Sequence, residues 1–153
     1  MIRDETYAFL CSLRLAREEI QLCKERTQEL EDAVRRITAA WKEAPGGSGD
    51  VHKDSTVIAL ADQRAKLLQR EKEYAQQMLK VEAFIDRLEN PDHRAILRLR
   101  YVRQLPWSRV VEGLHQYGLY YTDRHVTRLH GKALLEARKL WIVEHRDGEG
   151  GQA

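Results

Sequence analysis

The sequence predicts an all-α protein, with an N-terminal antiparallel helical hairpin (a coiled coil) followed by a three-helix helix-turn-helix domain. Three observations support this fold class. Charged residues make up 33% of the 153 residues and aromatic residues only 7%, a composition that favours helices over sheets. Apolar positions recur every three or four residues over two long stretches. The last third joins two short amphipathic stretches to a longer basic one through a turn that contains glycine.

The first long stretch predicts one continuous helix. Ten positions follow one another at alternating spacings of four and three residues, and all but one of them are apolar. This spacing is a heptad pattern. These positions are Phe9, Leu13, Ala16, Ile20, Cys23, Thr27, Leu30, Val34, Ile37 and Trp41. The helix is expected to end near Ala44, because proline and three glycines follow it. We expect residues 44–55 to form a flexible loop.

The second long stretch predicts a partner helix. Its heptad positions are Val57, Leu60, Arg64, Leu67, Glu71, Tyr74, Met78, Val81, Ile85 and Leu88, and Asp54 or Ser55 could cap its start. Two such helices joined by a loop pack most simply as an antiparallel coiled-coil hairpin, over residues 4–89. The apolar stripe is either wholly intramolecular core or, in part, a homodimer or partner interface. The sequence leaves both alternatives open.

Residues 91–146 predict three further helices. Pro91 suits the first turn of a helix over 92–104, with its apolar face at Ile96, Leu97, Leu99 and Tyr101. A second helix over 107–116 offers Trp107, Val110, Val111 and Leu114 to the core. Gly118 lies in the turn, and Thr122 is the expected N-cap of a third helix over 123–143. The inner stripe of that third helix is Val126, Leu129, Ala133, Leu134 and Ala137, and residues 147–153 are expected to be a disordered tail.

Positive charge is concentrated in this C-terminal block. Residues 92–146 hold 11 Lys and Arg against five Asp and Glu, a net charge of +6, and five of the six histidines. Residues 1–91 and residues 147–153 each have a net charge of −2. An anionic partner is therefore expected to bind the basic block, and double-stranded DNA is the partner that fits a helix-turn-helix.

The third helix of this block is expected to lie in the major groove of DNA. Arginine can bind guanine with two hydrogen bonds, and threonine or histidine can reach base edges or phosphates. Arg109, Arg138 and Lys139 are better placed for phosphates. The predicted DNA-binding residues are Arg109, Thr122, Asp123, Arg124, His125, Thr127, Arg128 and Lys132, and Gly131 lies on the same outward face.

The block also carries motifs of a known family. These are Ile96-Leu97-Arg98-Leu99-Arg100-Tyr101, then Trp107 with Val110-Val111, and then Thr122, Val126, Leu129 and Lys132-Ala133-Leu134. Over residues 94–138 the chain resembles region four of bacterial sigma factors. With its coiled-coil front, it is similar to phage and prophage transcriptional regulators of the sigma-region-four-like, ArpU-like group. The resemblance implies promoter or operator binding through Asp123, Arg124, Thr127 and Arg128, and implies RNA polymerase as a second partner.

Other classes of function remain as alternatives. One is a phage DNA-packaging subunit, similar to a small terminase, whose coiled coil assembles a ring. Another is an adaptor that binds RNA polymerase and has little DNA affinity. An enzyme is not expected, because the sequence lacks the HExxH, paired CxxC, P-loop and GxSxG motifs. We expect no cofactor and no metal site, since His125 and His130 do not share a helical face closely enough for a zinc pair.

The cellular compartment follows from what the sequence lacks. No apolar run approaches the roughly 18 residues of a membrane span, and the first residues lack the apolar core of a secretory signal. Cys11 and Cys23 lie on one predicted helix, too far apart to be bridged within it, and are expected to be reduced thiols. These features predict a cytoplasmic protein with no membrane partner.

Overall fold

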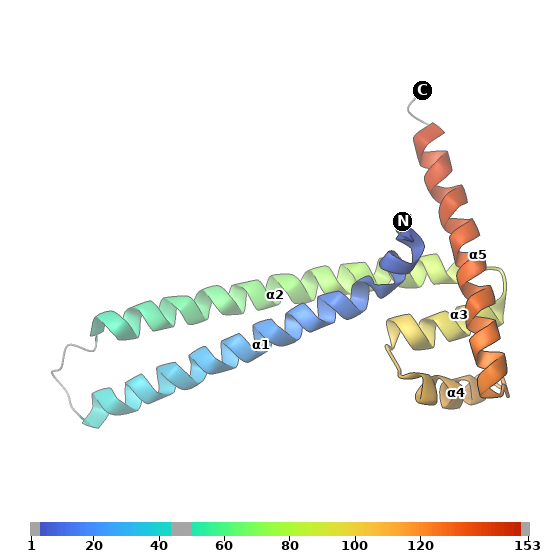
Figure 1. Cartoon of the computed structure of the whole chain (residues 1–153). Coiled ribbons are helices and arrows are strands. Elements are labelled where there is room, and N and C mark those ends of the chain that lie inside the picture. The colour runs from blue at the N-terminus through green and yellow to red at the C-terminus, as the bar shows by residue number, and fades with distance from the viewer. Residues whose placement is uncertain (1–3, 44–49, 151–153) are drawn as a thin grey trace. The chain divides into compact units, whose positions relative to one another are not determined.

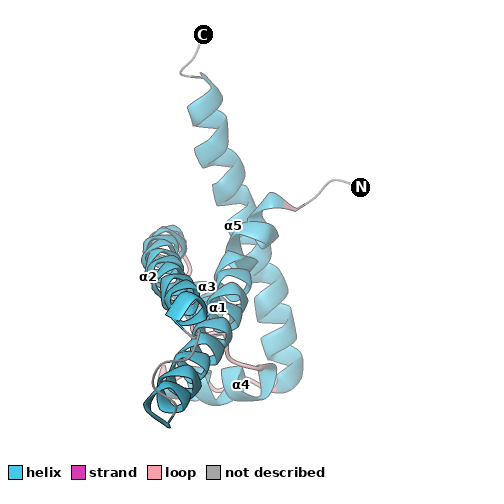
Figure 2. Cartoon of the chain, turned by 90° about the vertical axis from the view of Figure 1, so that its left-hand side faces the viewer, coloured by secondary structure: helices cyan, strands magenta, loops and turns pink. Residues whose placement is uncertain are grey.

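The computed structural model describes residues 4–43 and 50–150, and every regular element in these ranges is a helix (Figure 2). The all-α prediction is therefore confirmed. In chain order the elements are α1 (Glu5–Glu43), α2 (Asp50–Asp86), α3 (Pro91–Leu97), the π-helix η1 (Arg98–Val102), α4 (Trp107–Gln116) and α5 (Asp123–Gly150), as labelled in Figure 1. Across the described residues, no helix has the length and apolar character needed to cross a membrane.

The chain divides into two compact units that differ from the predicted domains. One unit is Leu15–Ala75, and the other combines the chain up to Arg14 with the chain from Gln76 onward. The sequence predicted a division near residue 90, between domains 4–89 and 91–146. The division lies elsewhere because Val81 and Phe84, near the end of α2, are buried together with the short helices that follow.

The unit Leu15–Ala75 is an antiparallel pair of helices. Ile20, Cys23 and Leu30 of α1 and Leu60 of α2 are buried, as the heptad pattern predicts. Thr27, which interrupts the apolar pattern, is also buried, and its hydroxyl donates a hydrogen bond to the Cys23 carbonyl at 2.8 Å. The polar position in the stripe is therefore satisfied within its own helix.

Ion pairs between the two helices fix which residues lie opposite each other. Arg64 lies 3.0 Å from Glu31, Arg70 lies 2.7 Å from Glu19, and Glu71 lies 3.9 Å from Lys24. Arg64 and Glu71, which break the apolar pattern of α2, thus pair with charges of α1. Exposed pairs of this kind stabilise a fold by only about 0–1 kcal/mol, so their main effect is on register.

Two predicted irregular segments are helical where the structure describes them. The predicted loop 44–55 is wrong for residues 50–55, because α2 begins at Asp50, directly after the last helix-breaking glycine. Residues 44–49 lie outside the described residues. The predicted tail 147–153 is wrong for residues 147–150, because α5 continues to Gly150 rather than ending at residue 143. A helical glycine costs only about 1 kcal/mol, and no proline interrupts this segment. Residues 151–153 lie outside the described residues.

In the second unit, the ends of the two long helices pack with the short helices. Leu10 and Leu13 of α1, Ile85 of α2 and Leu88 just after α2 are fully or almost fully buried. An aromatic cluster joins three helices of this unit. The ring centroid of Phe9 lies 5.4 Å from that of Phe84 and 4.9 Å from that of Trp141, and those of Phe84 and Trp141 are 5.7 Å apart. This cluster links α5 to both long helices.

The predicted helix over 92–104 is shorter and changes type. Asn90 caps α3, since its side chain accepts a hydrogen bond from the Asp92 backbone N–H at 2.9 Å. From Arg98 to Val102 the chain forms a π-helix, which ends with the Arg103 N–H donating to the Arg98 carbonyl at 2.9 Å. Gln104 then has a φ of +57°, a conformation that favours glycine. The predicted helix therefore ends at Val102.

The second and third helices of this block begin where the sequence predicts. α4 has the predicted bounds, Gly118 has the expected positive φ of +78°, and α5 starts at Asp123. α5 packs on α3 (Figure 1). The expected core positions are buried, except that Val111 and Leu134 are half-buried and Trp107 is 38% exposed. The prediction that Trp107 is buried in the core is therefore wrong. Trp107 is the first residue of α4, and its ring packs against Arg100 and His130, whereas Val110 and Leu114 further along the helix are buried.

Candidate nucleic-acid interface

The start of α5 is fixed by a side-chain cap. The Thr122 hydroxyl accepts a hydrogen bond from the His125 backbone N–H at 3.4 Å and lies 2.9 Å from the His125 Nδ1 atom. The Thr122 carbonyl accepts the Val126 N–H at 2.9 Å, which begins the helical ladder. Thr122 is therefore the N-cap that the sequence predicts, and it also orients His125.

The turn before α5 is tied to α3 through Tyr121. Its hydroxyl donates a hydrogen bond to the Asp92 carboxylate at 2.8 Å, and this bond raises the pKa of the Tyr121 hydroxyl. The first turn of α5 is thus held from both sides, by the cap at Thr122 and by the contact of the preceding residue with α3.

The first three turns of α5 have one buried and one exposed face. Val126 is 3% exposed, Leu129 is 9% exposed and Ala133 is fully buried, so this stripe anchors the helix. All eight predicted DNA-binding residues are exposed: Arg109, Thr122, Asp123, Arg124, His125, Thr127, Arg128 and Lys132. Gly131 is exposed as well. The anchoring stripe therefore leaves the predicted contact residues directed to solvent.

The charges of α5 are used differently in its two halves. Within the part of the chain that the structure describes, Arg124, Arg128 and Lys132 form no ion pair with a carboxylate. The exposed Asp123, one residue before Arg124, offsets part of their positive charge. The N-terminal half of α5 thus has cations that remain available to an external anion.

The C-terminal half of α5 is instead committed to internal contacts. Glu136 lies 3.3 Å from the imidazole of the buried His93, and Glu144 binds Arg87 with two hydrogen bonds. Arg138 pairs with Asp4, and this pair lowers the pKa of the Asp4 carboxyl. The expectation that Arg138 contacts phosphate is therefore not supported, since its guanidinium is already bound to a carboxylate.

A groove separates the start of α4 from the start of α5. It has a volume of about 290 Å³ and is lined by Trp107, Ser108, Val111, Asp123, Val126 and Thr127. The Thr127 hydroxyl donates a hydrogen bond to the Asp123 carbonyl at 3.1 Å, so it is engaged within its own helix. Arg109 is exposed on α4 but does not line this groove. The structure therefore gathers seven of the eight predicted residues on α5 and its cap, and leaves Arg109 apart.

Two exposed aromatic residues in the turn were not selected from the sequence. Tyr120 is 81% exposed and Tyr117 is 46% exposed. The ring of Tyr120 lies 5.2 Å from that of His115 on α4. The sequence does contain a signal for these two tyrosines, because they flank a turn glycine and precede a cationic helix. Tyrosine hydroxyls at such a place can bind phosphates.

Part of the chain matches a known protein family. Residues 38–130 match the family described as "Protein of unknown function (DUF1492)". The chain belongs to the DUF1492 family. The matched span runs from the last turns of α1 into the first turns of α5, so Arg109, Thr122 and Arg128 lie within it, whereas Lys132 lies beyond it. Comparisons with curated proteins and with solved structures gave no match.

Metal-ligating side chains do not gather in the described part of the chain. There, no three His, Cys, Asp or Glu residues are arranged so that they could hold a metal ion. Cys11 and Cys23 are free thiols, as the sequence predicts, and Cys23 is buried against Gln63 of α2 at 3.9 Å.

Proposed function

We propose that this DUF1492 protein is a sequence-specific transcriptional regulator that binds promoter or operator DNA through the N-terminal half of α5. The observation that carries the proposal is a set of cations on the exposed face of a capped helix, Arg124, Arg128 and Lys132, which pair with no described carboxylate. In a helix-turn-helix, these positions enter the major groove and meet base edges. The resemblance to sigma region four and to ArpU-like phage regulators supports the same assignment.

Individual residues have distinct expected roles. Arg124 and Arg128 are four residues apart, lie on the same helix face and are suited to bind guanine edges. Arg109 and Lys132 are suited to phosphates, which position a protein without sequence preference. His125 is engaged with Thr122, so we assign it to orientation of the helix start rather than to base contact.

The test is selection of bound sequences from random duplex DNA, followed by affinity measurements on the enriched site. We expect Arg128→Ala and Arg124→Ala each to reduce discrimination between the enriched and a scrambled site by about 1–3 kcal/mol, or roughly 5- to 150-fold. Arg109→Ala should weaken both sites equally and lower the salt dependence of log K by about one. All affinities should fall steeply as ionic strength rises.

Arg146→Ala is the matched control for these variants. Arg146 is also exposed on α5 but lies roughly 27 Å along the helix from Arg128, at the usual rise per residue. Its loss changes the net charge by the same amount and should leave discrimination unchanged. Equal discrimination by wild type and both α5 variants would refute the proposal.

The same experiment separates the alternatives. A packaging subunit would enrich no sequence motif and would show the mass of a ring in light scattering. An RNA polymerase adaptor would bind duplex DNA weakly and would bind purified polymerase in a manner that Arg124→Ala or Arg128→Ala alters.

A further inference from the structure

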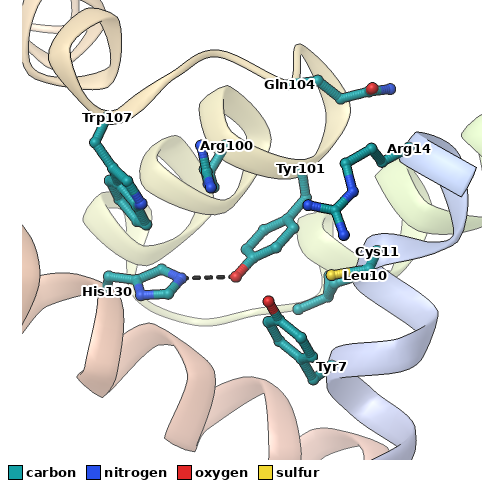
Figure 3. Close-up of a pocket in the computed structure, with 9 residues that line it drawn as sticks. All are labelled: Tyr7, Leu10, Cys11, Arg14, Arg100, Tyr101, Gln104, Trp107 and His130. Atoms are coloured by element: carbon teal, nitrogen blue, oxygen red, sulfur yellow. Dashed lines mark hydrogen bonds between the residues drawn. The ribbon is translucent and has the colours of Figure 1, made fainter. Parts of the chain in front are cut away.

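The unit that contains the short helices has a cavity that none of the predicted DNA-binding residues lines. It has a volume of about 290 Å³, and Figure 3 shows the side chains that surround it. Tyr7 and Arg14 extend into it from the first turns of α1, Arg100 and Tyr101 come from η1, and His130 comes from α5 (Figure 3). Elements from distant parts of the sequence therefore build this one cavity.

The cavity is cationic. Two arginines line it, and among the described residues no Asp or Glu does. Neither Arg14 nor Arg100 forms an ion pair with a described carboxylate. Two guanidinium groups in one small cavity without a counter-charge favour binding of an anion, since each presents planar N–H donors that fit a carboxylate or phosphate.

The guanidinium of Arg100 is held in position before any ligand binds. It lies over the ring of Trp107 at 4.6 Å, and its Nη1 donates a hydrogen bond to the Leu105 carbonyl at 2.9 Å. Arginine has five N–H donors, so these two contacts leave donors for a ligand. Fixing a side chain in advance lowers the entropy lost on binding.

Aromatic rings and neutral polar groups form the other walls. The Tyr101 hydroxyl lies 2.7 Å from the His130 Nε2 atom, and Tyr7 packs edge-on against the Tyr101 ring at 6.2 Å. Burial raises the pKa of the Tyr101 hydroxyl, and burial together with the charge of Arg100 lowers the pKa of His130. Both groups are therefore neutral at pH 7, and the arginines set the charge of the cavity.

The backbone beside the cavity is irregular in two ways. Arg100 and Tyr101 belong to the π-helix, a rare element that occurs often at functional sites. Gln104, which also lines the cavity, has a positive φ of +57°. A residue other than glycine with a positive φ, such as Gln104, persists where the surrounding structure enforces that conformation, and such residues cluster at ligand sites.

We propose that this cavity is a binding site for a small aromatic anion, a ring that carries one carboxylate or phosphate group. The anionic group binds between Arg14 and Arg100, and the ring packs against Trp107 and Tyr7. The site does not depend on the DNA-binding surface, because none of the predicted DNA-binding residues lines it.

The probes are phenyl phosphate, benzoate, inorganic phosphate and uncharged benzyl alcohol, titrated into the full chain without DNA. Binding is followed by NMR through the indole N–H of Trp107 and the ring of His130, with the Trp107 signal assigned by Trp107→Phe. We expect saturable shifts with at least one aromatic anion below about 10 mM, a range that detects a Kd of a few millimolar. Inorganic phosphate should bind more weakly, and benzyl alcohol should not bind.

Variants locate the bound anion. Arg14→Gln should weaken binding of the aromatic anion about tenfold or more, while Arg17→Gln, an exposed arginine one turn further along α1, should not change it. Arg100→Lys retains a positive charge at a position where Arg100→Gln could disturb the fold, and it should weaken binding because it removes the planar donor pair.

Three outcomes would overturn the proposal. One is the absence of saturable shifts with both phenyl phosphate and benzoate at about 10 mM, whether or not inorganic phosphate binds. Another is equal binding by wild type and Arg14→Gln. The third is a loss of duplex DNA affinity in Arg14→Gln as large as the loss of probe affinity, which would assign the cavity to a DNA phosphate instead. Failure of the DNA-binding proposal would leave the probe titrations unaffected, so the two proposals fail separately.

Discussion

At the scale of single residues, Gly118 and Gly131 differ in whether their backbone conformation requires glycine. Gly118 has a φ of +78° in the turn before α5, and no atom lies within 4 Å of the place a β-carbon would take, so only backbone conformation restricts it. Gly131 lies within α5 with open space around it and ordinary helical backbone. A β-carbon should therefore destabilise one position and stabilise the other.

We expect Gly118→Ala to lower the free energy of unfolding by about 1–2 kcal/mol, because alanine rarely adopts a left-handed conformation. Gly131→Ala should raise it by up to about 1 kcal/mol, because alanine loses less backbone entropy in a helix. Urea unfolding of both variants beside wild type measures the two changes. If both substitutions changed the free energy of unfolding in the same direction, the positive φ of Gly118 would not be what requires glycine there.

His130 predicts a pH dependence at the same scale. Burial first, and then Arg100, lower its pKa below the ordinary 6.5 in the folded chain. As pH falls below about 6.5, the unfolded chain binds a proton before the folded chain does, so folding stability is lost from there downward through the lower folded pKa. Above that range the imidazole is neutral in both states and contributes no pH dependence.

We therefore expect wild type to lose more unfolding free energy than His130→Gln between pH 7.5 and pH 5.5. Glutamine retains a polar partner for the Tyr101 hydroxyl but does not titrate. The other histidines are common to both proteins, so their contributions cancel in the difference. Chemical unfolding at the two pH values measures it, and an equal loss in both proteins would show that His130 titrates alike in the folded and unfolded chain.

At the scale of elements, the sequence predicted best the helices with strong local boundaries. α4 and the start of α5 matched because Pro106, Gly118 and Thr122 are each sufficient to begin or end a helix locally. The exposed set on α5 followed from the three-and-four spacing of its buried stripe, which leaves Arg124 and Arg128 outside. Boundaries of this kind depend on a few neighbouring residues, so a single sequence is enough to place them.

Elements that depend on distant contacts were missed. The π-helix from Arg98 to Val102 has no local sequence signature, and its buried Leu99 and Tyr101 are packed by other elements. The cavity proposed to bind an aromatic anion is lined by both Tyr7 and His130, which are more than a hundred positions apart in the sequence. The pairing of Arg138 with Asp4 is equally distant in sequence. Side-chain periodicity gives the face of a helix but not the partner that this face meets, so these features required the tertiary structure.

At the scale of the whole molecule, the short helices depend on the ends of the long ones. Leu10 and Leu13 of α1, Phe84 of α2 and Leu88 just after α2 lie in the core of the unit that carries α5. Each buried apolar side chain of this size stabilises a fold by about 1.5–3 kcal/mol. A domain has a total stability of only about 5–15 kcal/mol, so these residues together decide whether the unit folds.

Two shortened proteins test this dependence. Removal of residues 1–88 deletes these four core side chains, and we expect the product to unfold without cooperativity. Removal of residues 15–75, with Arg14 joined to Gln76 through a Gly-Ser linker of about four residues, keeps them, and a linker of this length spans two packed helices. The hydrogen bond from Gln77 to Ser12, at 3.0 Å, shows that the two ends already lie side by side. This second protein should melt cooperatively in circular dichroism, and cooperative melting of the first protein at the same temperature would contradict the assignment of the core.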